Sequence, residues 1–244
     1  MSDDNSTGRN AHPTETRSAK TESNFMTTKP AAKIILGSRS PRRRELLGSI
    51  VGQECLVILP PSSPDEPGFA DVSDEAGIER RLIDIVQMKH DDICRQLAAM
   101  PGEPIPPFVV VADTIVIASD DNGTRCVLGQ PGPERWQDEV RSWFRRWLSG
   151  RTHEVWTGVR ISHGNQQTQF IVRSKVTFCE VSDELLEWYV ATGESTGKAG
   201  GYAIQSHAAL FVTRFEGSLT SIIGLPLMEV VAGLTKLGWR RDAP

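Results

Sequence analysis

The sequence predicts an α/β or α+β protein built on a mixed β-sheet with flanking helices. From Lys33 onward, short apolar runs typical of buried strands alternate with segments of helical periodicity. Turn signals between some of the apolar runs indicate hairpins, so antiparallel pairs are expected beside parallel ones. An apolar fraction of 39% in 244 residues is ample for a packed core.

The first 31 residues differ in composition from the rest. Ser, Thr, Asn and charged residues dominate this stretch, and few of its side chains are apolar. Such a composition is typical of disorder. We therefore expect a disordered leader over residues 1–31 and one folded domain over residues 32–244. A transit peptide is disfavoured by four acidic residues, Asp3, Asp4, Glu15 and Glu22.

The first half of the domain follows from apolar runs and capping residues. "KIILG" is a strand buried on both faces, and Ser40 and Pro41 then suit the N-cap and the first position of a helix. "CLVILP" is a second strand, and "PSSPDEPGFAD" is a loop. The next helix is capped by Ser73 and ends at "PGEPIPP". Its apolar residues follow helical spacing: Ile78, Leu82, Ile85, Ile93 and Leu97. "FVVVADTIVIA" is then a strand.

The second half begins with the hairpin signal "SDDNGTRC". A helix is expected over Glu134–Ser149, ended by Gly150, and two long strands over Thr152–Ser162 and Gln169–Glu180. Ser182 caps the helix "DELLEWYVAT", and the glycine-rich loop "TGESTGKAGGYAIQ" follows. The strand "ALFVTRF" leads to a last helix around "LPLMEVVAGLTKL". The helix before Thr152 has an apolar side that we interpret as a packing face, made of Trp136, Val140, Trp143 and Trp147.

Composition excludes several classes of protein. The formal net charge of −4 argues against non-specific nucleic-acid binding. The four cysteines are scattered without a C-x-x-C pair, which indicates free thiols in a reducing compartment, and the histidines have no zinc-ligand spacing. No apolar stretch approaches the ~20 residues that span a bilayer. We expect a cytoplasmic protein with neither membrane nor nucleic acid as partner.

The stretch "ILGSRSPRRRELL" predicts an anion site. A strand, a tight loop and a helix start leave free backbone N–H groups and a partial positive charge at the loop. Ser38 and Ser40 add hydroxyl donors, and Arg42 and Arg43 add guanidinium forks that match phosphate oxygens. The alternative is an ordinary helix start with solvated arginines. Arginine at a helix N-terminus opposes the helix dipole, however, which favours an anionic partner.

Acidic residues supply the second candidate group. Asp113 lies in an otherwise apolar strand, where a carboxylate is costly unless it is paired or bound to metal, so it is a candidate general base or Mg²⁺ ligand. A structural Asp at a strand end is an equally good interpretation. Asp65 and Glu66 are candidates for a second carboxylate, although a solvated acidic loop is commoner. Lys89 falls at a polar position of its helix, where a surface lysine is the ordinary expectation.

"GKAGGYAIQ" is the third candidate. Its glycines permit close approach of the backbone to a ligand, Lys198 can neutralise a phosphate, and Gln205 can read the edge of a base. Composition alone would favour a flexible surface loop. His153, His163 and His207 are interpreted as structural or surface residues.

Three stretches together resemble the Maf-type nucleoside triphosphate pyrophosphatases, in family order. They are "ILGSRSPRRRELL", "VVVADTIV" followed by "LGQP", and "KAGGYAIQSHAALFV" with "EGS" and "IIGLPL". The resemblance covers about Lys33 to Gly238. It implies the fold of the inosine triphosphate pyrophosphatases, with a long mixed sheet, helices on both sides and two lobes around a central cleft.

The resemblance also implies an activity. Such enzymes hydrolyse a nucleoside triphosphate to the monophosphate and pyrophosphate with Mg²⁺ or Mn²⁺, and often form homodimers. By this resemblance Asp113 is the proton-accepting aspartate and, with Glu66, a metal ligand. The substrate-binding residues implied are Ser38, Arg42, Arg43, Lys89, Thr114, Lys198 and Gln205.

Residues near the base divide the family into branches. The branch that prefers 7-methyl-GTP has Trp in place of Arg42, Gln in place of Thr114 and Glu in place of Gln205. This chain resembles the branch that cleaves dTTP and UTP, and modified pyrimidine analogues are also expected substrates. The physics agrees, because a neutral pyrimidine offers carbonyls and one N–H to a neutral Gln and an Arg, whereas a cationic methylguanine suits Trp and Glu.

Two positions depart from the family pattern. Gln130 replaces the usual lysine of "LGKP" and removes one positive charge from the cleft, and Ser206 replaces a glycine. Gln130 also keeps open an alternative function, a nucleotide-binding regulator of cell division with weak catalysis.

Overall fold

The computed structural model of the chain describes residues 33–63, 66–100 and 107–240. The expected leader, the candidate Asp65 and most of the "PGEPIPP" segment lie outside the described residues. Among those that are described, no helix has the length and apolar character needed to cross a membrane.

Seven strands and six α-helices make up the described part. The strands are β1 (Ile34–Leu36), β2 (Leu56–Ile58), β3 (Phe108–Ser119), β4 (Arg125–Leu128), β5 (Thr152–His163), β6 (Gln166–Phe178) and β7 (Val212–Glu216). The α-helices are α1 (Pro41–Val51), α2 (Glu75–Ala98), α3 (Trp136–Trp143), α4 (Asp183–Ala191), α5 (Leu219–Ile223) and α6 (Leu227–Lys236). One π-turn extends α3, and short 3₁₀ turns occupy Gln53–Cys55, Ala199–Gly201 and His207–Phe211.

All seven strands belong to one mixed sheet, as predicted. Its order is β2-β1-β3-β5-β6-β7, with β4 paired to β3 beside this path. Strand β1 runs parallel to β2 and β3, whereas β3, β5, β6 and β7 form an antiparallel series. The β3–β4 hairpin lies where the Asn-Gly signal predicts it.

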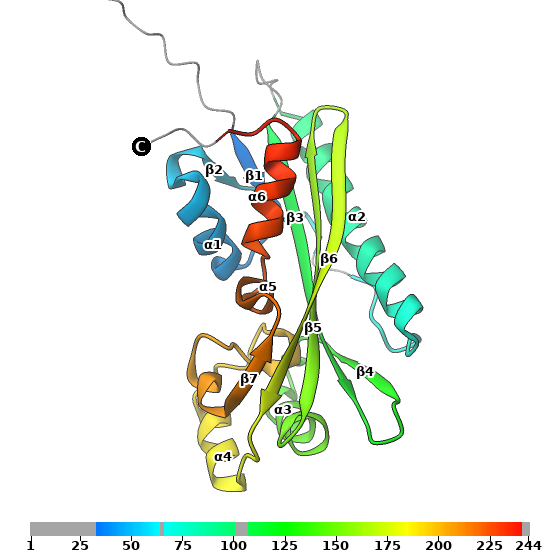
Figure 1. Cartoon of the computed structure of the whole chain (residues 1–244), viewed down its shortest axis with the longest axis vertical. Coiled ribbons are helices and arrows are strands. Elements are labelled where there is room, and N and C mark those ends of the chain that lie inside the picture. The colour runs from blue at the N-terminus through cyan, green and yellow to red at the C-terminus, as the bar shows by residue number, and fades with distance from the viewer. Residues whose placement is uncertain (1–32, 64–65, 101–106, 241–244) are drawn as a thin grey trace, which may run out of the picture. The chain divides into compact units, whose positions relative to one another are not determined.

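Helices cover both faces of the sheet (Figure 1). Because side chains alternate along a strand, Ile34 and Leu36 of β1 face one way and Ile35 the other. The first two pack in a cluster with α1 and α6, and Ile35 packs in a second cluster with α2. The flanking helices of the predicted fold are therefore confirmed, with α1 and α6 on one face of β1 and α2 on the other.

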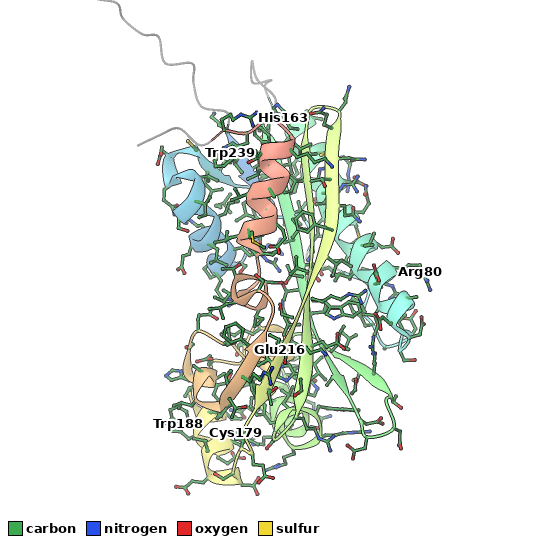
Figure 2. The ribbon with its side chains drawn as sticks, in the orientation of Figure 1. Arg80, His163, Cys179, Trp188, Glu216 and Trp239 are labelled. Carbon is green, nitrogen blue, oxygen red and sulfur yellow. The ribbon has the colours of Figure 1, made fainter. Side chains whose placement is uncertain are left out.

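A third apolar cluster packs α3, its π-turn and α4 against the other end of the sheet. Figure 2 labels residues at both ends, with His163 and Trp239 at one and Cys179 and Trp188 at the other. On the face of β3 that carries α1, Ala112 belongs to the α1–α6 cluster and Val116 to the α3–α4 cluster. The side chain of Thr114 lies between these two cores.

Several element boundaries differ from the sequence prediction. Ser40 and Ser182 are N-caps as expected, but α2 is capped by Asp74 instead of Ser73, since the Asp74 carboxylate accepts from the Gly77 N–H at 2.8 Å. Helix α3 begins at Trp136, two residues after the predicted start. The "ALFVTRF" run becomes a strand only at Val212, because a 3₁₀ turn takes its first part, and α5 was not predicted.

One edge of β3 is open in the middle of the strand. Pairing with β1 ends at Val110, and pairing with β4 begins at Val116. No described strand pairs with this edge between the two points, while β5 pairs continuously with the opposite edge. Side chains from both faces of β3 can therefore line one space at this gap, and Asp113 and Thr114, which point to opposite faces, both do so.

Candidate active site

A cavity of about 340 Å³ lies at the open edge of β3. Elements from both halves of the sequence meet there, from the start of α1 to the turn before α6. All nine residues assigned to the site by the family resemblance line it: Ser38, Arg42, Arg43, Glu66, Lys89, Asp113, Thr114, Lys198 and Gln205. The cavity thus lies where a cleft is predicted, while the role of each residue in binding or catalysis stays a prediction.

The loop between β1 and α1 forms one wall of the cavity. Ser40 is the N-cap, and its hydroxyl accepts from the Arg43 N–H at 3.4 Å. Ser38 is buried, and its hydroxyl oxygen accepts from the Ser40 N–H at 3.1 Å. Pro41 takes the first helical position, where its missing N–H costs nothing. The helix start and its partial positive charge therefore face the cavity.

Arg43 is held by neutral groups. Its Nε donates to the Gly224 carbonyl at 2.8 Å, and its two terminal nitrogens donate to the hydroxyls of Ser38 at 3.3 Å and Thr114 at 3.0 Å. Burial lowers the pKa of Arg43, and the charge of Asp113 opposes this shift. An arginine stays protonated nonetheless. The site thus contains a fixed guanidinium with no direct carboxylate partner among the described residues, and an anion would complete it.

Two further cations, Arg42 and Lys198, line the cavity. Burial lowers the pKa of Lys198, and the nearby charge of Arg42 lowers it further. Burial also lowers the pKa of Arg42, partly offset by Glu45. A bound anion stabilises like charges that lie near one another. Positive charge therefore converges here from α1 and from the glycine-rich loop.

Lys89 joins the two predicted metal carboxylates. Its Nζ lies 2.6 Å from Asp113 Oδ1 and 2.8 Å from Glu66 Oε1. Lys89 is only 9% exposed, so the ordinary expectation of a surface lysine is wrong. The open edge of β3 explains this, because Asp113 points to the α2 face and needs a partner from that helix. The alternative of Asp113 at a strand end is also wrong, since β3 continues to Ser119.

The donor set suits a hard divalent cation. Two carboxylates that share one ammonium lie close together, and carboxylate oxygens are what Mg²⁺ and Mn²⁺ prefer. In the described part of the chain, no group of three or more His, Cys, Asp or Glu side chains could form a cage for a metal. Mg²⁺ usually binds one or two carboxylates together with substrate phosphates and water. Glu66 and Asp113 fit such a shared ion.

The glycine-rich loop is packed. A Cβ on Gly200 would lie 2.9 Å from Val116, and one on Gly201 would lie 2.9 Å from Val140; both residues have positive φ. The Gly200 N–H also donates to the Gly129 carbonyl at 3.0 Å. The interpretation as a flexible surface loop therefore fails. The loop brings Lys198 and Gln205 to the cavity because its glycines lie directly against β3 and α3.

The cavity lining also includes apolar and carboxamide side chains. Val116, Val155 and Tyr202 line it, and so do Gln130 and Gln205. An apolar wall with a few donors and acceptors suits a nucleobase. Sequence reasoning missed Tyr202, although it lies in a motif already selected, because a single tyrosine carries no sequence signal for a cavity wall.

Arg39 was also missed. It lines the cavity, and its guanidinium donates to the Pro61 carbonyl at 2.7 Å. Its place in the arginine-containing loop is the signal that could have identified it.

The residues interpreted as structural make packing contacts and hydrogen bonds with other side chains. The buried His153 has Nε2 2.7 Å from the Tyr202 hydroxyl, and His163 stacks on Phe108. Neither they nor the exposed His207 are among the described residues that line the cavity. The predicted tryptophan face packs in the α3–α4 cluster. Cys94, Cys126 and Cys179 are free thiols, as expected.

Comparison with known proteins supports the resemblance. The family described as Maf-like protein matches residues 33–237. A dTTP/UTP pyrophosphatase of Pyrococcus horikoshii is 36% identical over 208 residues, covering 85% of this chain and 97% of that protein. A dTTP/UTP pyrophosphatase of Syntrophus aciditrophicus is 37% identical over 209 residues, covering 84% and 90%. One from a Geobacillus strain is 34% identical over 207 residues, covering 85% and 99%. With its cavity lined by the family's three motifs, the chain belongs to the Maf family.

Proposed function

We propose that this chain is a nucleoside triphosphate pyrophosphatase that cleaves dTTP and UTP, together with modified pyrimidine analogues. The products are the nucleoside monophosphate and pyrophosphate. Relatives that match almost along their whole length are named dTTP/UTP pyrophosphatases, which supports the reaction class. The observation that carries the proposal is one cavity in which a cationic cradle faces a carboxylate pair.

The chemistry is attack of water on the α-phosphorus. The water oxygen forms a bond to that phosphorus, the bond from it to the α,β-bridging oxygen breaks, and the proton from water passes to the Asp113 carboxylate. Lys89 holds that carboxylate in place at 2.6 Å. Arg43 and Lys198 bind phosphate oxygens and stabilise the charge on the departing pyrophosphate, so positioning and electrostatics provide the catalysis.

Glu66 and Asp113 would hold the metal ion. A bound Mg²⁺ or Mn²⁺ supplies positive charge to the phosphate oxygens. Lys89 lies between the two carboxylates and would share them with the ion.

Pyrimidine preference is assigned to the other part of the cavity. Gln205 offers a donor and an acceptor to the carbonyls and N–H of uracil or thymine, and Arg42 adds a donor for a carbonyl. A purine with a cationic ring has no acidic partner among the two carboxamides and the apolar residues of this wall.

A panel of nucleotides tests the proposal. Pyrophosphate release is measured from UTP, dTTP, CTP, ATP and 7-methyl-GTP with Mg²⁺ and with EDTA. We expect UTP and dTTP to have the highest kcat/KM and EDTA to abolish release. Absence of pyrophosphate with every nucleotide, combined with measurable UTP binding, would instead favour the regulator without hydrolysis, to which the neutral Gln130 points.

We also propose a cytoplasmic site of action and a homodimer, with no nucleic acid as partner. Free nucleotides as substrates and the scattered thiols support the compartment. The dimer rests on the family resemblance alone, and sedimentation of the purified chain tests it.

A further inference from the structure

The ends of the glycine-rich loop are joined by one nearly buried carboxylate. The Glu194 side chain is 6% exposed. Its Oε2 accepts from the Ser206 hydroxyl at 2.7 Å and from the His207 backbone N–H at 2.8 Å. His207 Nδ1 lies 2.6 Å from the same oxygen and donates in the tautomer that carries its hydrogen there. Three donors, one from Ser206 and two from His207, thus meet one oxygen of a residue twelve and thirteen positions earlier.

The second oxygen and the backbone of Glu194 make further contacts within the loop. The buried Tyr189 hydroxyl lies 3.4 Å from Glu194 Oε1 and donates to the Gly201 carbonyl at 2.9 Å. The ammonium of Lys198 donates to the Glu194 backbone carbonyl. Burial of Glu194 opposes its ionisation, but the bonds from Ser206 and His207 outweigh burial, so its pKa is lowered. The residue is therefore a charged acceptor surrounded by loop donors.

The chain between the two ends carries the cavity residues. Lys198 and Gln205 both lie between Glu194 and Ser206, and both line the cavity, while Glu194 does not. We propose that Glu194 is a positioning residue whose carboxylate fixes the 194–207 loop and thereby sets where Lys198 and Gln205 meet the nucleotide. This proposal rests on the proposed function, because the two residues matter only if a nucleotide binds there.

We call the bonds from Ser206 and His207 to the Glu194 carboxylate the Glu194 clamp, and Ser206 makes this clamp stronger in the present chain. A glycine, the usual family residue at this position, has no side-chain donor. The Ser206 hydroxyl adds a bond to a charged acceptor, and such bonds are stronger than neutral ones. Ser206, which departs from the family pattern, is therefore explained by its bond to Glu194.

A positioning role and a merely structural role predict different kinetics. If Glu194 only stabilised the fold, its loss would lower Tm and the fraction of active enzyme, which reduces apparent kcat and leaves KM unchanged. If it positions Lys198 and Gln205, the folded enzyme binds nucleotide less well, so KM rises. A misplacement of about 1 Å can cost up to roughly a hundredfold in kcat/KM.

The test compares Glu194→Ala and Glu194→Gln with the wild-type chain, and Glu187→Gln serves as the control. Glu187 is an exposed carboxylate on α4 that pairs with Arg141 and does not line the cavity, so its change removes the same charge nearby. We expect Glu194→Ala to raise the KM for UTP at least about tenfold. Its kcat also falls, because a displaced Lys198 stabilises the departing pyrophosphate less well. Glu194→Gln keeps one acceptor oxygen and should fall between Glu194→Ala and wild type. Glu187→Gln should match wild type.

Hydrogen exchange gives a readout independent of substrate. The His207 amide donates to Glu194, so its exchange should accelerate in Glu194→Ala and not in Glu187→Gln. Unchanged KM in Glu194→Ala, or a fall in kcat and Tm alone, overturns the positioning role. If wild type releases no pyrophosphate, the proposed function fails, and the clamp is then judged by the Kd of α,β-imido-UTP. Equal Kd values for wild type and Glu194→Ala would overturn it there too.

Discussion

Lys89 Nζ lies 2.6 Å from Asp113 Oδ1, which couples the middle of α2 to the open edge of β3. The same nitrogen is 2.8 Å from Glu66 Oε1, so one ammonium offsets the repulsion between two carboxylates. The carboxylates stay together at the cavity because this cation is built into a helix that also packs against the sheet. The acid to which we assign proton acceptance and the acid proposed as a further metal ligand thus share a single support.

Asp113→Asn tests the proton acceptor. The amide has nearly the same shape but cannot take a proton from water, so we expect kcat for UTP to fall by about 10²- to 10⁴-fold. Circular dichroism should show an intact fold. Pyrophosphate release from the purified variant is the measurement, and turnover close to wild type would remove Asp113 from this role.

Arg43→Lys tests whether the guanidinium fork is required. Lysine cannot reach Gly224, Ser38 and Thr114 together, so buried acceptors lose donors. We expect a loss of about 1–3 kcal/mol in the free energy of unfolding, measured with urea, and a large fall in kcat/KM. The neighbouring exposed Arg44 supplies the control, because Arg44→Lys should change stability by no more than ~0.5 kcal/mol. Equal stability of the two variants would contradict the anchoring of Arg43.

The buried His153 should make the free energy of unfolding sensitive to acid. Burial lowers its pKa to about 3 in the folded chain, whereas an unfolded histidine titrates near 6.5. Between these values the unfolded chain binds one more proton, so stability falls as the pH drops from about 6.5 toward 3, by about 1.4 kcal/mol per pH unit. Above pH 6.5 this effect is absent.

A matched variant isolates that histidine from other groups. Burial also lowers the pKa of His90, and carboxylates titrate in the same range, so wild type is compared with His153→Gln, which does not titrate. Urea unfolding at pH 4.5, 5.5 and 7.5 is the measurement. Parallel pH dependences in the two proteins would show that His153 takes up no proton on unfolding.

Sequence patterns predicted which helices and strands form better than they predicted where each begins and ends. The apolar run of β3 and the Ser40–Pro41 start of α1 were readable because a strand period and a cap are local signals. Asp74 replaced Ser73 as a cap because two adjacent residues of equal propensity are distinguished only by the path of the chain. Helix α5 is five residues long, too short for a periodic pattern.

Motifs likewise predicted the members of the cavity but not their contacts. Resemblance brought Lys89 and Glu66 into the site, whereas helical periodicity placed Lys89 on the surface. Its burial depends on the gap between β1 and β4, which requires the pairing register of three strands. Glu194 was missed for a similar reason, because its partners lie twelve and thirteen residues away across a folded loop.

Gln205→Glu tests the assignment of base preference. A carboxylate cannot donate to the carbonyls of uracil and suits a cationic ring instead. We expect kcat/KM for UTP to fall about tenfold, which corresponds to the loss of about one hydrogen bond. The kcat/KM for 7-methyl-GTP should rise relative to that for UTP. The ratio of the two is the readout. A ratio unchanged from wild type would place the base elsewhere in the cavity.

Gln130→Lys restores the charge that the family usually has in "LGKP". Gln130 lines the cavity, and the neighbouring Gly129 carbonyl ties its loop to Gly200, beside Lys198. An added ammonium attracts the triphosphate, so we expect the KM for UTP to fall about fivefold, equivalent to about 1 kcal/mol, at low ionic strength. Because salt screens partly exposed charges, the advantage should shrink at 0.5 M salt, where the Debye length is only about 4 Å. Gln166→Lys adds the same charge on the exposed end of β6, outside the cavity, and should leave KM unchanged. If both lysine variants bound UTP equally well, the missing family lysine would not be what limits binding at this site.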